Sequence, residues 1–214
     1  MSARGSLAAH GTARPAVAAE LPPPALEGGL SLERVLALRR SVRSFAASPL
    51  TLSEVARLLW AAQGLTHEDD GRTAPSAGGL HPLRALLVAE RVEGLAPGVH
   101  AYEPAGHRLI QRHAGPALAD LGAAAWKQSC VAGAAAALVV AAVYETTTDR
   151  YGERGIRYVH LEAGHALENA HLEATALGLG AVVVGAFEDD AVARVLRARP
   201  GERPLGLLAV GRRR

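Results

Sequence analysis

The most regular pattern in the chain is an apolar stripe that recurs every three or four residues. Its members are Ile156, Val159, Ala163, Ala166, Ala170, Ala174 and Leu177. This spacing places all seven side chains on one face of an α-helix, so the segment from 156 to 177 predicts one long helix. The alanines among them are small enough to let a second helix approach closely. Gly178 and Gly180 predict where the helix ends.

Polar residues mark the starts of two earlier helices. Ser31 is a suitable N-cap for a helix that ends near Arg40. Thr51 and Glu54 have the spacing of a capping box, which predicts a helix that ends near Gly64. The other expected elements are helices over 116–126 and 189–199 and strands over 84–90, 99–102, 136–144, 181–184 and 205–210. Helices and strands therefore alternate around one sheet, which predicts an α+β fold.

Chain length and local composition predict the domain organisation. A chain of 214 residues is long enough for one large domain or two small ones. Residues 1–30 are rich in alanine and proline, and three consecutive prolines at 22–24 exclude a helix there. Beyond this segment the sequence shows no linker. We expect a flexible N-terminal extension over 1–30 and a single folded domain over 31–214.

The overall composition excludes several classes of protein. Cys130 is the only cysteine, so an internal disulfide is impossible. A hydrophobic content of 49% and a charged content of 21% exclude a mostly disordered chain. The formal net charge of +2 gives no signal for nucleic acid, and the apolar runs are too short to span a membrane. We expect a cytoplasmic protein that binds neither nucleic acid nor membrane.

The first candidate site is the segment RRSVRSF over 39–45, at the end of the first expected helix. It contains Arg39, Arg40, Ser41 and Arg43. The guanidinium group donates two parallel hydrogen bonds, a geometry that suits phosphate. The alternative is a solvated basic helix end, where cations interact favourably with the helix dipole.

The second candidate site is the stretch 72–82, which contains APSAGGLHP. Its small residues and two glycines would let the backbone approach a flat ligand closely and direct N–H groups at it. The alternative is an ordinary surface loop. The stretch has no GxGxxG spacing and precedes a strand instead of following one, which disfavours a Rossmann-type nucleotide site.

The third candidate site is Arg150 with Tyr151, just before the long helix. Together they would place a cation and a phenol at a ligand, and a tyrosine can act as a general acid or base. The alternative is a charged helix start held by local ion pairs.

The fourth candidate site is the polar side of the long helix, formed by His160, Glu162, His165, Glu168, Asn169 and His171. His165 and Glu168 are three residues apart and could share a metal. The zinc-protease pattern HExxH is absent from the sequence. We therefore expect residues of an interface or of buried hydrogen bonds and no metal. A metal-dependent hydrolase that uses His160, His165 and Glu168 is the alternative.

Taken in order, four segments resemble the nitroreductase superfamily, and more narrowly its SagB-type dehydrogenase branch, which includes azoline oxidases. They are RRSVRSF, APSAGGLHP, RYGERGIRYVHLEAGHALENAHLEATALGLGAVVVGAFEDD and PLGLLAVG. The resemblance covers about residues 21 to 211. It implies an α+β fold with a mixed, antiparallel-rich sheet flanked by helices. It also implies an intertwined homodimer, with one FMN at each interface and the long helix at its centre.

The resemblance also assigns roles to individual residues. Arg39, Arg40 and Ser41 match the segment that holds the FMN phosphate, and Arg43 matches a basic residue near the pyrimidine edge of the flavin. The segments that line the flavin ring match Pro75, Ser76, Ala77, Gly78 and Gly79 and, near N5, Val184, Gly185 and Ala186. Arg212, Arg213 and Arg214 follow the last strand, where the family often has further phosphate ligands.

The function that this resemblance implies is an FMN-dependent oxidoreductase with a ping-pong mechanism. Electrons would pass from NAD(P)H to a nitroaromatic or quinone-like acceptor, or from an azoline-type small molecule or modified peptide to oxygen. Azoline oxidases have a Lys-Tyr pair where this chain has Arg150 and Tyr151. Arginine stays protonated, so proton abstraction at residue 150 is disfavoured while Tyr151 stays available. The alternative is a non-catalytic flavin-binding subunit of a peptide-modification complex.

Overall fold

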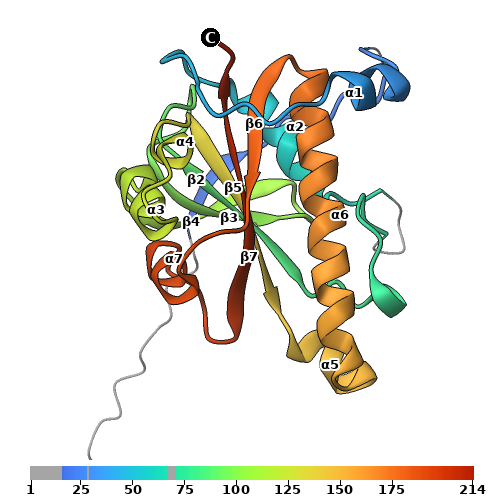
Figure 1. The fold of residues 1–214 in the computed structure, drawn as a ribbon. Coiled ribbons are helices and arrows are strands. Elements are labelled where there is room, and N and C mark those ends of the chain that lie inside the picture. Colours follow the sequence, from blue (N-terminus) through green and yellow to red (C-terminus); the bar gives the residue numbers. More distant parts are fainter. Residues whose placement is uncertain (1–15, 28, 67–70) are drawn as a thin grey trace, which may run out of the picture.

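An antiparallel sheet with helices on both faces forms the framework of the protein (Figure 1). The computed structural model describes residues 16–27, 29–66 and 71–214. Within these residues the sheet has seven strands in the order β1-β4-β3-β2-β5-β7-β6, and all neighbouring strands are antiparallel. The strands are β1 (Val17–Glu20), β2 (Leu83–Ala89), β3 (Gly98–Glu103), β4 (Arg108–Ala114), β5 (Ala136–Val143), β6 (Leu179–Val184) and β7 (Glu202–Arg212).

The helices form two layers, one on each face of the sheet. They are α1 (Leu32–Leu38), α2 (Leu52–Gln63), α3 (Leu118–Ala124), α4 (Ser129–Ala132), α5 (Glu145–Tyr151), α6 (Arg154–Ala176) and α7 (Asp189–Val195), with a 3-10 turn η1 (Ala77–Gly79). In β5, Leu138 and Val140 pack with α2 and α6, whereas Val139 and Ala141 pack with α3, α4 and α7. This alternation is the period of a strand buried on both faces. In the described part of the chain, no helix is both long and apolar enough to cross a membrane.

The long helix is confirmed as α6, and its alanine stripe faces the core of its own chain. Ala166, Ala170 and Ala174 are fully buried against α2 and the sheet. An ion pair of 2.5 Å between Arg57 on α2 and Glu173 on α6 joins the two helices at their edge. The close helix approach that the alanines predict is therefore made to α2.

The predicted helix caps are also confirmed. The Ser31 hydroxyl accepts a hydrogen bond from the amide of Arg34 at the start of α1. At the start of α2, Thr51 Oγ1 accepts from the Glu54 amide and the Glu54 carboxylate accepts from the Thr51 amide. Both caps satisfy amide groups that would otherwise have no partner inside the helix.

Sequence reasoning missed β1, β4, α4 and α5, and two predicted helices are shorter than expected, because α3 ends at Ala124 and α7 at Val195. β1 changes the expected domain boundary. Its residues pair with β4, and Leu21 after it is 8% exposed, so part of the segment expected to be flexible belongs to the sheet. Residues 1–15 and 28 lie outside the described residues. β1 is a four-residue edge strand that is held by pairing with the distant β4, so its own residues give little signal. β4 lies between β1 and β3, but most of its residues are only half-buried and show no clear alternation.

The packing of α6 gives a test of the alanine stripe. Ala170→Leu adds volume at a fully buried position and should destabilise the fold by about 1–3 kcal/mol. Gly164→Ala is the matched control, because a Cβ at this exposed helical position meets no atom within 4 Å. It should be neutral or stabilising by up to about 1 kcal/mol. Urea unfolding of both variants measures the difference, and equal stabilities would contradict the packing described for α6.

Candidate functional site

The basic segment 39–45 runs along the ends of β6 and β7. The amide of Val42 donates to the carbonyl of Ala181 at 2.8 Å, and Phe45 forms a bridge with Arg213. The approach is close because the strands present glycine there. A Cβ on Gly180 would lie 2.8 Å from the Val42 side chain, and a Cβ on Gly211 would lie 2.8 Å from Phe45. These two glycines therefore let the segment lie directly against the sheet.

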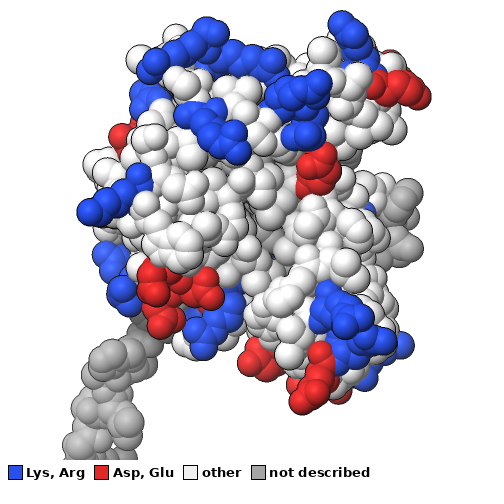
Figure 2. Space-filling view, viewed as in Figure 1, with Lys and Arg blue, Asp and Glu red and all other residues white. Residues whose placement is uncertain are grey.

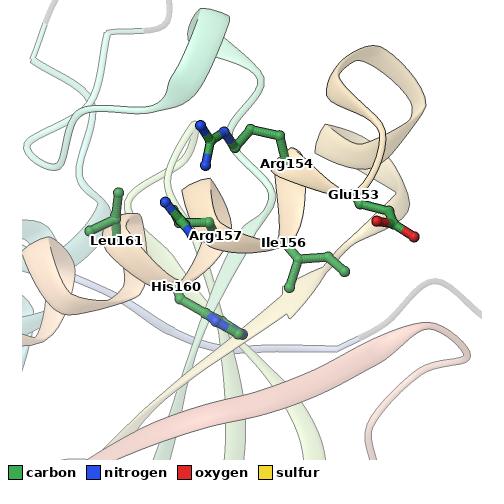
Figure 3. A pocket seen from close by; sticks show the side chains of 6 residues that line it. All are labelled: Glu153, Arg154, Ile156, Arg157, His160 and Leu161. Atoms are coloured by element: carbon green, nitrogen blue, oxygen red, sulfur yellow. The ribbon is translucent and has the colours of Figure 1, made fainter.

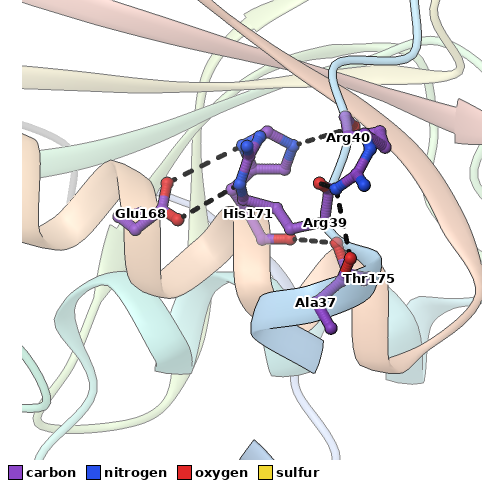
Figure 4. Close-up of polar contacts among 6 residues, drawn as sticks. All are labelled: Ala37, Arg39, Arg40, Glu168, His171 and Thr175. Atoms are coloured by element: carbon purple, nitrogen blue, oxygen red, sulfur yellow. Dashed lines mark hydrogen bonds and ion pairs between the residues drawn. The ribbon is translucent and has the colours of Figure 1, made fainter. Parts of the chain in front are cut away.

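A buried histidine on α6 holds the same segment from the other side (Figure 4). His171 Nε2 donates to the carbonyl of Arg40 at 3.3 Å, and His171 Nδ1 lies 3.9 Å from the Glu168 carboxylate. Glu168 also forms an ion pair of 3.6 Å with Arg39. Burial lowers the pKa of His171, since the protein interior disfavours the charged imidazole. The neutral ring thus works as a hydrogen-bond donor that positions the segment.

Four arginine residues in or near this segment are exposed to solvent. Arg40 donates to the carbonyls of Ala37 and Arg39, while Arg213 and Arg214 donate through Nε to the carbonyls of Leu179 and Phe45. Arg43 is exposed next to them in sequence. Figure 2 shows Lys and Arg side chains gathered along the upper edge of this face, near α1 and the C-terminus. This edge can therefore attract an anion.

Arg212 differs from its neighbours because its guanidinium already has a carboxylate partner. Its Nη1 and Nη2 atoms donate to the Glu54 carboxylate at 2.6 and 2.9 Å, and its Nε donates to the carbonyl of Pro49. The bidentate pair joins the end of β7 to the start of α2. Of the three C-terminal arginines, Arg213 and Arg214 are the ones whose guanidinium groups have no carboxylate within 4 Å in the described chain.

The end of β6 presents an open stretch of backbone. Gly185 is exposed, and a Cβ built on it would meet no atom within 4 Å. The Gln128 side-chain amide donates to the carbonyl of Ala186 at 2.9 Å and fixes this turn. Gly185 lies four residues beyond Ala181, which is about 13 Å along a strand. A long ligand could therefore contact the arginines at one end and Gly185 at the other. Sequence reasoning missed Gln128.

The loop 75–79 is held by a buried carboxylate on α6. The amide of Ala77 donates to Glu162 Oε1 at 2.8 Å, and the Ser76 hydroxyl accepts from the amide of His81 at 2.8 Å. The Glu162 residue is 4% exposed, and burial raises the pKa of its carboxyl group while the bonds from Ala77 and Ser76 oppose that rise. Glu162 therefore stabilises the loop by accepting hydrogen bonds.

The same loop meets the third candidate site. A Cβ on Gly78 would lie 2.6 Å from the Tyr151 hydroxyl and 3.0 Å from Arg150 Nη1, and Gly78 has a φ of +62°. A larger residue would be strained at this φ and would need the Tyr151 or Arg150 side chain to move. The Arg150 guanidinium lies 5.4 Å from the Tyr151 ring centre, and the Tyr151 ring packs edge-on against Tyr158. The structure therefore brings the second and third candidate sites together.

These contacts define two separate groups of site residues. The basic half-site consists of Arg40, Ser41, Arg43, Gly185, Ala186, Arg213 and Arg214, and the loop half-site consists of Pro75 to Gly79, Arg150 and Tyr151. In Figure 1 the loop after α2 lies on one side of α6, and the β6–α7 connection lies on the other. Glu162 and His171, which hold the two halves, are about 14 Å apart along the helix. A single chain therefore keeps the two half-sites apart.

A hollow of about 750 Å³ lies along the first turns of α6 (Figure 3). Its lining residues are Glu153, Arg154, Ile156, Arg157, His160 and Leu161. Ile156 is 44% exposed and Leu161 is 55% exposed. Two large aliphatic side chains on the solvent side of a helix indicate a surface that another protein surface can cover.

The polar residues of α6 do not assemble a metal site. Among the residues that the structure describes, no three histidine, cysteine, aspartate or glutamate side chains are grouped to hold a metal. His160 shares a hydrogen bond of 2.5 Å with the Tyr144 hydroxyl, and His165 is exposed. Glu168 is turned to Arg39 and His171. Although these residues lie on one helix, His160 contacts Tyr144 whereas Glu168 contacts Arg39 and His171.

The sequence and the fold were both found to be similar to those of known proteins. The model of the nitroreductase family matches residues 36–212. A candidate nitroreductase of Methanocaldococcus jannaschii is 45% identical over 184 residues, which are 86% of this chain and 92% of that protein. The crystal structure of a candidate nitroreductase from Ralstonia eutropha is 27% identical and has a TM-score of 0.80, covering 99% of this chain and 96% of the other.

A third match, to the Escherichia coli microcin synthetase McbBCD complex with a truncated pro-MccB17 bound, has a TM-score of 0.74. It is 22% identical and covers 90% of this chain and 76% of the matched chain. At this identity the match shows a shared fold.

The buried imidazole predicts a pH-dependent stability. Because the pKa of His171 is lower in the folded state, the unfolded chain binds a proton first as the pH falls below about 6.5. Stability should fall with decreasing pH by up to about 1.4 kcal/mol per pH unit for this group. His171→Gln should show a shallower fall between pH 6.5 and 5, measured by urea unfolding. His165→Gln, at an exposed position on the same helix, is the control, and equal slopes in wild type and His171→Gln would contradict the role of His171.

Proposed function

The chain belongs to the nitroreductase family, and we propose that it is an FMN-dependent oxidoreductase that transfers electrons between two substrates in turn. Members of this family commonly use FMN, with NAD(P)H as electron donor. The observation that carries the proposal is the basic half-site. It presents exposed guanidinium groups at one end of β6 and an open glycine backbone at the other.

The basic half-site fits the phosphate of FMN. Arg40, Arg213 and Arg214 provide fixed positive charge, and the Ser41 hydroxyl adds a neutral donor beside them. Arginine suits phosphate because two N–H groups donate in parallel. Arg39 contributes to the segment indirectly, since its charge is paired with Glu168. Arg212 is paired with Glu54, so it supports the end of β7.

The fit of the ring rests on backbone shape. With no side chain at Gly185, a planar ring can lie against the strand end, and Gln128 fixes the Ala186 carbonyl by donating a hydrogen bond to it. Pro75 to Gly79 would cover the ring from a second direction, because a Cβ on Gly79 would meet no atom within 4 Å and the backbone there is open. Both surfaces are needed to exclude water from the reacting atoms.

We propose that a second copy of the chain completes each site. The two half-sites of one chain lie on opposite sides of α6, so a dimer about α6 would place the loop half-site of one copy over the basic half-site of the other. Exposed Ile156 and Leu161 on α6 are apolar surface for that contact. Relatives in this family are typically homodimers.

When bound, FMN supplies the hydride chemistry, and the side chains supply position and charge. Arg43 would stabilise the negative charge of the reduced ring. The Tyr151 hydroxyl, which is held beside Gly78, is the candidate proton donor or acceptor for the substrate. Arg150 stays protonated, so it can orient an anionic group or hold Tyr151 but cannot remove a proton.

We favour electron flow from NAD(P)H to a nitroaromatic or quinone-like acceptor. The SagB-type branch remains the second candidate, with an azoline-type substrate and oxygen as the acceptor. The fold match to the microcin synthetase complex, whose structure contains a bound truncated pro-MccB17, supports that second candidate. Arg150 disfavours the SagB-type candidate, because azoline oxidation would need a base at this position and arginine stays protonated. A non-catalytic flavin-binding subunit would bind FMN without turnover.

Flavin binding tests the basic half-site. The purified protein should show a flavin absorption spectrum and release FMN when denatured. Arg43→Ala should weaken FMN binding by about tenfold to a hundredfold, since a lost charge-assisted hydrogen bond costs about 1.5–3 kcal/mol. Arg34→Ala, an exposed arginine on α1, is the control and should bind FMN normally. Fluorescence titration of the apoprotein measures both, and equal affinities would contradict the assigned site.

Turnover tests the loop half-site. Tyr151→Phe removes only the hydroxyl, so FMN should stay bound while kcat falls by about a hundredfold or more, the usual contribution of a general acid or base. Tyr158→Phe is the matched control, because its ring packs against Tyr151. The measurement is steady-state reduction of a quinone and a nitroaromatic by NADPH. An unchanged kcat in Tyr151→Phe would remove Tyr151 from the mechanism.

A further inference from the structure

A second and larger cavity, of about 970 Å³, opens where the loop half-site ends. Gly79, Leu80 and His81 form one wall, and β2, β3 and β4 form the floor. Its charged lining residues are Arg72, Arg84, Glu103, Arg108, Arg112, Arg199 and Glu202. Neither the basic half-site nor the hollow along α6 contributes to this lining.

The described lining of this cavity is strongly basic. Apart from Arg72, four arginines face two glutamates, an excess of two positive charges. Both glutamates already have partners. Glu103 forms a bidentate pair with Arg108, and Glu202 accepts two bonds from Arg112 at 2.5 and 2.8 Å. The side chains of Arg112 and Glu202 are 8% and 5% exposed, so this pair forms a neutral, rigid part of the wall.

The guanidinium groups of two cavity arginines, Arg84 and Arg199, form no ion pair with a carboxylate within 4 Å among the described residues, although the Arg199 amide donates to Glu202. Arg84 donates through Nη1 to the carbonyls of His81 and Leu83 at 3.1 and 2.9 Å, which fixes its orientation. A guanidinium has five N–H donors, so others remain for a ligand. Arg199 is exposed at the rim. Arg84 and Arg199 can therefore bind an anion without breaking an ion pair.

Much of the remaining lining is apolar, beside the polar residues Gln63, His81 and Tyr102. The apolar residues include Leu65, Leu80, Leu83, Ala101 and Ile110. A free inorganic ion would leave this surface in water. A molecule with an apolar body and one anionic group would cover it and satisfy the arginines at the same time. The mixture of apolar wall and cationic rim thus defines the chemical class of the ligand.

We propose that this cavity binds an organic anion, with a carboxylate or phosphate group held by Arg84 and Arg199, beside the proposed flavin. The proposal rests on the proposed function for the role of that anion as donor or acceptor, because Gly79 continues the loop half-site into the cavity. Two sources share this chemistry. One is the phosphate-bearing end of a dinucleotide donor, and the other is a carboxylate on the organic substrate.

Isothermal titration of the purified protein tests the proposal with 2′,5′-ADP and with 4-nitrobenzoate as separate probes. At least one should bind, and binding should weaken as salt increases. The double variant Arg84→Gln, Arg199→Gln should bind that probe at least about tenfold more weakly, which corresponds to about 1.4 kcal/mol. Binding of 2′,5′-ADP identifies the donor as the source of the anion, and binding of 4-nitrobenzoate identifies the substrate.

Two controls separate the possible failures. Arg203→Gln removes one charge next to Glu202 in sequence, but Arg203 pairs with Asp190 outside this cavity, so this variant should bind as wild type does. Arg199→Gln alone changes only an exposed side chain. If Arg84→Gln fails to fold, probe binding to this single variant is measured instead. The proposal is overturned if neither probe binds at millimolar concentration or if the Arg84 and Arg199 variants bind normally. Flavin content is measured in parallel. If the protein binds the anion but contains no flavin, the result contradicts the proposed function and leaves the proposed anion site standing.

Discussion

The burial of one face of α6 is the constraint on which the rest of the structure depends. Small side chains such as Ala166 and Ala170 let the helix lie close to the sheet and to α2, which leaves one rotation of the helix possible. That rotation directs Glu162 to the loop over 75–79 and His171 to the basic segment over 39–45. A single apolar contact surface therefore sets the positions of both half-sites, although none of its residues belongs to either.

The polar residues that α6 buries are used for support, and their energetics agree with this role. A buried carboxylate and a buried imidazole are costly unless they are hydrogen-bonded, and both have backbone partners. Gln128 supports the end of β6 in the same way. These residues hold main-chain segments whose own side chains or open backbone face the ligand. The proposed active site is therefore rigid before a ligand arrives, which lowers the cost of binding.

Much of the fold could be predicted because its signals are local. The apolar period of α6, the caps at Ser31 and Thr51 and the apolar run of β5 depend on neighbouring residues alone. β1 could not be found, because it is a four-residue edge strand stabilised by pairing with the distant β4. β4 could not be found, because most of its residues are only half-buried and give no clear alternation. The candidate segments were found by composition. The supporting role of Glu162 could not be predicted, because the sequence does not show which of the six polar residues on α6 is buried until the rotation of the helix is known.

The central claim is that each flavin site is made from two copies of the chain, and co-expression of two damaged copies tests it most directly. One copy carries Arg40→Glu and Arg43→Glu, and the other carries Gly78→Val, which would collide with Tyr151. Each variant alone should bind no flavin. A mixed dimer, isolated through a different tag on each copy, should bind one FMN, because one of its two sites combines two intact half-sites. A mixed dimer without flavin would contradict the account.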